Sequence, residues 1–151
     1  MGVFASLDDA GAAASAAHGA LKTVEMRKCC IEAIRQAGVQ HARELAELAV
    51  EETGMGRYED KVEKHLAVIN KTPGPECLTT EAKSGDAGLM LEEYAPFGVI
   101  CSTTPTTNPT ETIIYNTTSM IAGSNHMVSN VHLRHPRLSA VCLPALNPAN
   151  I

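Results

Sequence analysis

The sequence predicts an α/β fold that opens with helices, continues through an arm strand and reaches the first β-α-β unit of a doubly wound sheet. Residues before Pro73-Gly-Pro75 repeat apolar side chains at helical spacing. A polar, glycine-containing turn over 83–88 and an apolar run over 89–94 follow, and they indicate an extended arm. Residues 97–131 then place a helix between two short apolar strands, which predicts parallel strands joined by a crossover.

The chain therefore divides into three predicted parts. A helical segment takes residues 1–75, the arm takes 76–95, and an incomplete β-α-β region takes 96–151. A length of 151 residues is sufficient for one compact domain.

Helical periodicity and capping residues predict four helices in the first part. They cover residues 6–19, 23–38, 40–52 and 58–70. Ser6 and Thr23 are suited to cap the first two helices, because their hydroxyls can accept from backbone N–H groups. Gly38 is expected to end the second helix and Gly54 the third.

The fourth helix is predicted to be amphipathic. Val62, Leu66 and Ile69 recur at helical spacing and form its apolar stripe. With this stripe facing the core, Lys61 and Lys64 are expected on the solvated side.

The stretch from Pro96 to Glu111 is the most informative part of the sequence. Its apolar run, Val99-Ile-Cys101, is typical of a strand covered on both faces, so Cys101 is expected to be buried. Pro105 and Pro109 each disfavour the helical region in the preceding residue, so the loop between them is expected to be extended or turned.

A helix and a second strand are predicted after this loop. Thr110 is suited to cap a helix that runs to about Ala122, and a strand over His126–Val131 follows it. A last helix is expected to begin near Leu138 and to end before Pro144.

A strand, a tight polar loop and a helix N-terminus together form a common site for an anionic cofactor or a developing oxyanion. The alternative is an ordinary strand-to-helix crossover without a ligand. The glycine fingerprint GxGxxG is absent, and Gly54-Met-Gly56 is better interpreted as a helix end followed by a turn.

Composition excludes two classes of partner. The formal charge of −5 and the aromatic content of 3% argue against a nucleic-acid groove, which requires a basic surface. No apolar run approaches the ~20 residues of a transmembrane helix, so no membrane partner is expected. No secretory signal pattern opens the chain, and a cytoplasmic location is expected.

Cysteine and histidine spacings give no metal site. The five cysteines form no CxxC pair, so neither a zinc site nor a disulfide framework is expected. His132 and His135 form an HxxH pair without a third ligand at matching spacing, and the histidines are expected to be exposed or partly paired instead.

Several segments in register resemble the CoA-acylating aldehyde dehydrogenases of the aldehyde dehydrogenase superfamily. They are Glu52-Thr-Gly-Met-Gly-Arg-Tyr-Glu-Asp-Lys61, Lys71-Thr-Pro-Gly74, Glu92-Glu-Tyr-Ala-Pro-Phe-Gly-Val-Ile100 and Thr104-Pro-Thr-Thr-Asn-Pro109. The pattern is most similar to the propionaldehyde and acetaldehyde dehydrogenases of propanediol and ethanolamine utilisation. The match runs from about Gly2 to the neighbourhood of Asn125 and is weaker beyond it.

The resemblance implies the N-terminal portion of such an enzyme, with a Rossmann-like sheet that binds NAD and with CoA as co-substrate. The family reaction converts a short-chain aldehyde, CoA and NAD to acyl-CoA and NADH. The family's catalytic cysteine lies downstream of the matching region. The catalytic cysteine domain is therefore expected to be absent, and the chain to be inactive alone.

Two interpretations of different class follow. The chain is either part of an acylating aldehyde dehydrogenase or a non-catalytic module that packs on a full-length paralogue. Family members assemble through arm strands, so a homo-oligomer is expected for the full-length protein. Microcompartment association occurs in the family, but no targeting helix precedes Gly2, and encapsulation is not expected.

The resemblance also assigns site residues. It implies that Asn108 donates a hydrogen bond to the oxyanion beside the catalytic cysteine; the alternative is that Asn108 only starts a turn before Pro109. The remaining residues of the loop would line the nicotinamide and pyrophosphate: Thr104, Pro105, Thr106 and Thr107. Asn130 and His132, at the end of the second strand, would lie near the adenosine ribose, although Val131 and Leu133 replace two family prolines.

A second departure from the family concerns the turn Ile121-Ala-Gly-Ser-Asn125, where the family has Ala-Ala-Gly-Asn. Serine occupies the position before Asn125. If the turn requires a positive φ at Ser124, a side chain there is strained by about 1–2 kcal/mol.

Overall fold

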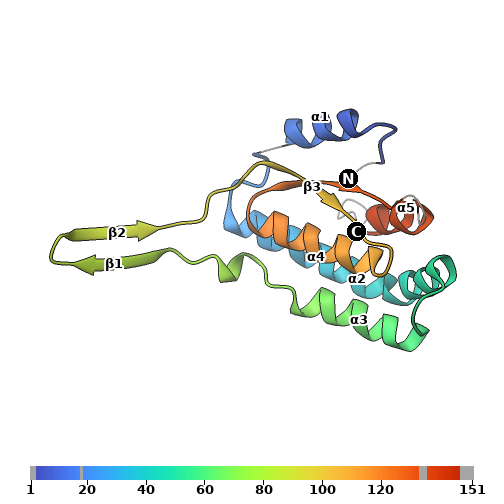
Figure 1. Cartoon of the computed structure of the whole chain (residues 1–151). Helices are drawn as coiled ribbons and strands as arrows, with labels where there is room; N and C mark the ends of the chain where they lie inside the picture. The colour runs from blue at the N-terminus through green and yellow to red at the C-terminus, as the bar shows by residue number, and fades with distance from the viewer. Residues whose placement is uncertain (1–2, 18, 133–135, 147–151) are drawn as a thin grey trace.

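The computed structural model describes residues 3–17, 19–132 and 136–146. Its helices are α1 (Leu7–Ala17), α2 (Val24–Thr53), α3 (Tyr58–Lys71), α4 (Pro109–Ala122) and α5 (Pro136–Ala145), with a short 3-10 turn η1 (Pro75–Cys77). Its strands are β1 (Glu81–Gly85), β2 (Gly88–Glu92), β3 (Val99–Thr103) and β4 (His126–Asn130). The predicted order of helices, arm and β-α-β unit is confirmed (Figure 1).

The second and third predicted helices are one helix of 30 residues, so the prediction that Gly38 ends a helix is wrong. Gly38 lies inside α2, where it is buried against α3. A Cβ at this position would lie 3.0 Å from Cδ1 of Ile69, which is too close for comfortable packing. Glycine costs a helix interior about 1 kcal/mol, and here it permits the close approach of α2 and α3. The predicted end at Gly54 is confirmed by its left-handed backbone.

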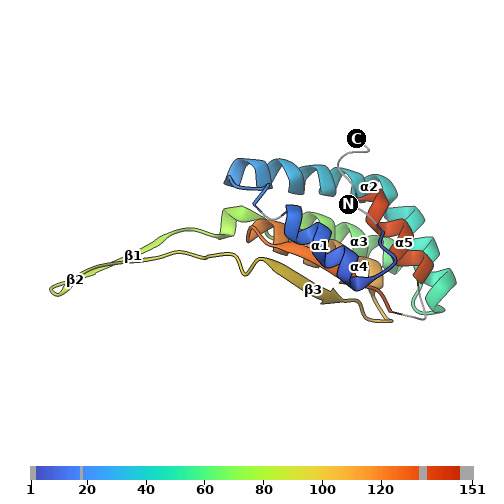
Figure 2. The same cartoon turned by 90° about the horizontal axis from the view of Figure 1, so that it is seen from above.

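The arm is a two-stranded hairpin and not a single strand. β1 pairs with β2 in antiparallel register from Glu81 opposite Glu92 to Gly85 opposite Gly88. The predicted turn over 83–88 is therefore too long, because Lys83 to Gly85 belong to β1. The hairpin extends far from the helices (Figures 1 and 2), and Leu89, on β2, is 68% exposed.

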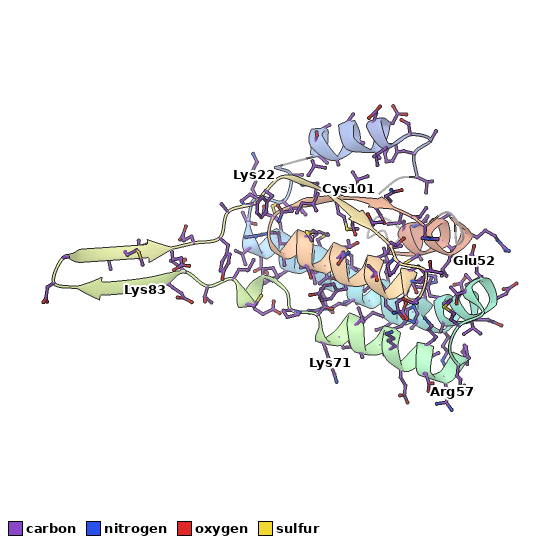
Figure 3. The ribbon with its side chains drawn as sticks, viewed as in Figure 1. Lys22, Glu52, Arg57, Lys71, Lys83 and Cys101 are labelled. Carbon is purple, nitrogen blue, oxygen red and sulfur yellow. The ribbon has the colours of Figure 1, made fainter. Side chains whose placement is uncertain are left out.

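The small sheet pairs β3 and β4 in parallel, with α4 as the crossover. Helix α1 contacts β4 on the face opposite α4, and α2 and α3 lie beyond α4 (Figures 1 and 2). Helix α1 packs mainly against β4, so one face of β3 is exposed to solvent. Val99 and Cys101 are exposed and only Ser102 of this strand is buried, so the predicted two-sided cover of β3 is wrong. Figure 3 labels Cys101 on this strand.

The core lies between the long helices and not on the sheet. Its buried side chains come from α2, α3, α4, α5 and Leu146, the residue after α5, with Ile34, Leu45, Ile69, Ile113 and Leu146 fully enclosed. Each such side chain contributes about 1.5–3 kcal/mol relative to an exposed one. Burial also raises the pKa of the Cys142 thiol to about 12, which makes it inert in the folded chain.

The last helix is slightly longer than predicted. α5 begins at Pro136, and Pro144 lies inside its final turn instead of ending it. None of the helices in the described part of the chain is long and apolar enough to cross a bilayer.

The turn after α4 has the strain that the sequence predicts. Ser124 has φ of 61°, and it is the non-glycine residue with positive φ among those the structure describes. Its N–H donates to the carbonyl of Ile121 at 3.0 Å, and the N–H of Asn125 donates to that of Met120 at 2.8 Å. These two bonds form a Schellman ending with serine in the position that glycine usually takes.

Replacing Ser124 by glycine is expected to raise the free energy of unfolding by about 0.5–1 kcal/mol, because glycine adopts positive φ without steric cost. Ser124→Ala is the matched control. It keeps the strained Cβ and removes the hydroxyl, which donates to the carbonyl of Leu21 at 3.3 Å. The free energy of unfolding of both variants is measured by urea denaturation. A Ser124→Gly variant that is no more stable than Ser124→Ala would contradict the presence of backbone strain at this position.

Candidate functional site

The register of the parallel strands brings the two predicted loops together. Thr103 pairs with Asn130 at the carboxyl ends of β3 and β4. The loop over 104–108 and residues 130–132 therefore leave the same edge of the sheet. Ligands of doubly wound sheets bind at this carboxyl edge.

Thr104 ties the two loops to each other. Its N–H donates to the carbonyl of Asn130 at 3.1 Å, and its hydroxyl donates to the same oxygen at 3.4 Å. The N–H of His132 donates to the Thr104 hydroxyl oxygen at 3.2 Å. Thr104 is 1% exposed, so the hydrogen bonds by which it links the two loops are buried.

The other predicted cofactor residues lie nearer the surface. Pro105, Thr107 and Asn130 are exposed, whereas Thr106 and His132 are half-buried. Hydroxyl, amide and imidazole groups can form hydrogen bonds with ribose hydroxyls and with pyrophosphate oxygens, so the side chains at this edge fit a nucleotide. His135, the second member of the predicted HxxH pair, lies outside the described residues. Among the described residues no group of three His, Cys, Asp or Glu side chains could hold a metal ion.

Asn108 occupies the N-cap position of α4, which corrects the prediction that Thr110 caps this helix. The Asn108 side chain caps no backbone N–H of α4. Its Oδ1 accepts from Nζ of Lys64 at 2.6 Å and from Nζ of Lys61 at 3.3 Å. Its Nδ2 donates to the hydroxyl of Thr107 at 3.3 Å.

Lys61 is buried, so the prediction that it is solvated is wrong. The buried residues of α3 are Lys61, His65 and Ile69, whereas Leu66 of the predicted stripe is only partly buried. Nζ of Lys61 donates to the carbonyl of Thr107 at 2.9 Å and forms an ion pair with Oε1 of Glu111 at 3.3 Å. The two side chains are 7% and 3% exposed, so this ion pair is shielded from water.

His65 and Thr110 continue the buried network. Nδ1 of His65 lies 2.7 Å from the carbonyl of Lys61 and must therefore carry a hydrogen. Nε2 lies 2.7 Å from the hydroxyl of Thr110, which also lies 3.0 Å from Oε2 of Glu111. A single hydroxyl hydrogen cannot serve both neighbours. With neutral His65 it goes to Nε2, and with protonated His65 it goes to Glu111.

Burial lowers the pKa of His65 below its usual 6.5, while its bond to the Lys61 carbonyl and the charge of Glu111 act in the opposite direction. The unfolded chain therefore takes up this proton first as the pH falls. The free energy of unfolding is expected to decrease below about pH 6.5, and less steeply in His65→Gln. Equal slopes in urea denaturation from pH 7 to pH 5 would contradict this assignment.

Glu52, the first residue of the first family segment, has a structural role. Its two carboxylate oxygens accept from the N–H groups of Arg137 at 3.2 Å and Leu138 at 2.7 Å. A carboxylate at this position accepts hydrogen bonds from backbone N–H groups that have no partner within the first turn of α5, and its negative charge interacts favourably with the helix dipole. Figure 3 shows Glu52 near the end of α2, beside α5.

Comparison with known proteins identifies the family, although no family model matches the sequence. The chain is 54% identical over 149 residues to the acetaldehyde dehydrogenase (acetylating) EutE of Salmonella typhimurium, covering 99% of this chain and 32% of the relative. Its structure matches a propionaldehyde dehydrogenase of a Clostridium phytofermentans fucose utilisation microcompartment with a TM-score of 0.93 at 46% identity. That match covers 99% of this chain and 35% of the other.

Two further structures show ligands in relatives. The propionaldehyde dehydrogenase of Rhodopseudomonas palustris with bound propionyl-CoA matches with a TM-score of 0.93 at 42% identity, over 99% of this chain and 34% of the other. An engineered glycolyl-CoA reductase with bound NADP+ matches with the same score and identity, over 99% and 35%. The chain spans about a third of the length of the relatives that it matches. By sequence and by fold, the chain matches about a third of the length of CoA-acylating aldehyde dehydrogenases.

Proposed function

We propose that the chain supplies the helical segment and the first part of the nucleotide-binding sheet of an NAD-dependent, CoA-acylating aldehyde dehydrogenase. The proposed reaction converts a short-chain aldehyde, CoA and NAD to acyl-CoA and NADH. The observation that carries the proposal is the pairing of Thr103 with Asn130, which gathers both predicted loops at one carboxyl edge. The identity of 54% to an acetylating relative supports the same reaction.

The residues at this edge divide into a binding group and a reacting group. Thr106, Thr107, Asn130 and His132 would hold the nucleotide, because they present hydrogen-bonding groups at the edge of the sheet. The nucleotide supplies the hydride acceptor when bound. Thr104 supports this group by fixing the distance between the two loops.

Asn108 would act on the substrate. An aldehyde attacked by a thiolate develops negative charge on its oxygen, and an amide N–H in a fixed position stabilises that charge. The Nδ2 group of Asn108 is such a donor at the start of α4. The thiolate itself would come from the part of the relatives' length that this chain does not span.

The test is a segment exchange. Residues 1–151 replace the matching segment of the Salmonella enzyme, and NADH formation from acetaldehyde is measured with and without CoA. CoA-dependent NADH formation by the folded exchange enzyme is the expected result. A folded exchange enzyme without this activity would overturn the proposal.

The arm supports a further proposal, a homo-oligomer. Both strands of the hairpin are exposed, and each has an outer edge that another strand can pair with. Leu91→Lys on β2 is expected to shift the chain toward monomer in analytical ultracentrifugation. An unchanged distribution of species would contradict assembly through the arm.

The exposed apolar residues near the arm also fit the alternative of a module that packs on a full-length paralogue. Tyr94 is 74% exposed and Phe97 is 95% exposed, which is unusual for side chains of this size. Co-purification of the tagged chain with such a paralogue, lost in Phe97→Ser, would support this alternative. The proposed location is the cytoplasm.

A further inference from the structure

The two lysines of α3 determine which way the Asn108 amide faces. The oxygen and nitrogen of an asparagine side chain have similar shapes, and only the hydrogen-bond partners distinguish them. Here the atom that faces α3 lies 2.6 Å from Nζ of Lys64 and 3.3 Å from Nζ of Lys61. An ammonium group donates and never accepts, so this atom must be Oδ1.

We propose that Lys61 and Lys64 are positioning residues that hold Oδ1 on the α3 side and turn Nδ2 of Asn108 toward the substrate. This inference rests on the proposed function, in which Nδ2 donates to the oxyanion. A carboxamide is planar and its two polar atoms point in different directions, so fixing Oδ1 also fixes Nδ2. Among the described residues Nδ2 has the Thr107 hydroxyl as its acceptor, which leaves a second hydrogen for a ligand.

The lysines also strengthen the donor that they position. Two positive charges at Oδ1 draw electron density from the amide, and linked hydrogen bonds strengthen one another by roughly 10–30% each. A neutral partner at Oδ1 would fix the amide without this polarisation. Two ammonium groups at one amide oxygen therefore serve both the orientation and the strength of Nδ2 as a donor.

The two lysines contribute in different ways. Lys61 is buried and also holds the loop through the Thr107 carbonyl, so it fixes the backbone that carries Asn108. Glu111 compensates its charge, and Nδ1 of His65 donates to the backbone carbonyl of Lys61 and holds that backbone in place. Lys64 is exposed and makes the shorter bond to Oδ1, so it acts on the side chain of Asn108 alone.

The first test reads the orientation without any activity. In the isotope-labelled 151-residue chain, the Asn108 carboxamide signal is assigned by its loss in Asn108→Ala, and its order parameter is measured by NMR relaxation. The order parameter is expected to fall in Lys64→Met and to recover in Lys64→Arg. Lys71→Met, on the same helix, is the matched control and is expected to leave it unchanged. An equally ordered carboxamide in Lys64→Met would overturn the inference.

Lys61 requires a paired variant, because Lys61→Met alone leaves the Glu111 carboxylate buried without its cation. Lys61→Met with Glu111→Gln removes both charges, and the carboxamide is again expected to become mobile. An Asn108 amide that stays fixed in a folded double variant would remove Lys61 from the proposal.

The second test uses the segment-exchange enzyme. Lys64→Met is expected to lower kcat about 10-fold while the KM for NAD stays nearly constant, because the donor is misaligned but the nucleotide site is intact. An unchanged kcat would overturn the inference. If the unaltered exchange enzyme is inactive, the proposed function fails, while the NMR experiment still decides whether the lysines orient Asn108.

Discussion

Lys61→Met is expected to lower the free energy of unfolding by about 3–5 kcal/mol, which is the largest loss of stability that we predict for a single exchange. The Lys61 and Glu111 side chains are 7% and 3% exposed, and their charged atoms lie 3.3 Å apart. Removing the cation leaves a carboxylate in the interior without its ion pair, and with neutral His65 the Thr110 hydroxyl donates to Nε2 of His65 and not to this carboxylate. Urea denaturation followed by circular dichroism measures this loss.

Two further variants show whether the buried charge is the cause. Glu111→Gln added to Lys61→Met is expected to recover part of the stability, because the double variant carries no uncompensated charge. Lys64→Met removes an exposed ammonium and is expected to cost less than about 1 kcal/mol. A Lys61→Met chain as stable as Lys64→Met would contradict the burial of this ion pair.

Asn108→Ala in the segment-exchange enzyme is expected to lower kcat by about 10²–10³-fold, the usual effect of losing one oxyanion donor. The side chain caps no backbone N–H of α4, so the loss should come from the reaction and not from the helix. The KM for NAD should change little, because the residues proposed to hold the nucleotide are elsewhere on the edge.

Asn70→Ala is the matched control for this exchange, because Asn70 is an exposed asparagine near the end of α3. It is expected to leave kcat unchanged. Activity of Asn108→Ala within a few-fold of the unaltered exchange enzyme would support the simpler interpretation, in which Asn108 only starts a turn.

The features that the sequence predicted correctly are those that depend on a few neighbouring residues. Ser6 and Thr23 each accept a bond from a backbone N–H three residues later, as expected for helix caps. The strained turn at Ser124 follows from the place of the serine after the helix. The parallel pairing of β3 and β4 follows from the predicted β-α-β order.

The errors concern residues whose environment is set by distant segments. Glycine is a common residue at helix ends, and Gly38 was therefore expected to end a helix. The side chain that requires a small residue at this position is Ile69, which lies 31 residues away in the sequence. Lys61 is charged, and only the approach of Glu111 from α4 makes its burial possible. The spacing along α3 offered one signal of this burial. Lys61, His65 and Ile69 follow one another at intervals of four residues, so they could have been recognised as one face of the helix.

Part of the candidate site could be proposed from the sequence. The loop and the end of β4 could be assigned from the residues and the resemblance, and the structure brings them to one edge. The lysine pair at Asn108 could not be assigned, because α3 and the loop are more than 40 residues apart in sequence and contact each other only in the fold. β1 also escaped prediction, because Glu-Ala-Lys-Ser-Gly has no apolar alternation.

The measurement that tests the proposed nucleotide site most directly is a titration of the isotope-labelled chain with NAD, followed through its amide chemical shifts. NMR detects weak binding, which is what part of a nucleotide site is expected to give. We predict saturable shifts concentrated on residues 104–108 and 130–132, and their loss in His132→Ala. A folded chain that shows no saturable shift, or whose shifts lie on the arm or the helices away from this edge, would contradict the assignment of the nucleotide to the carboxyl ends of β3 and β4.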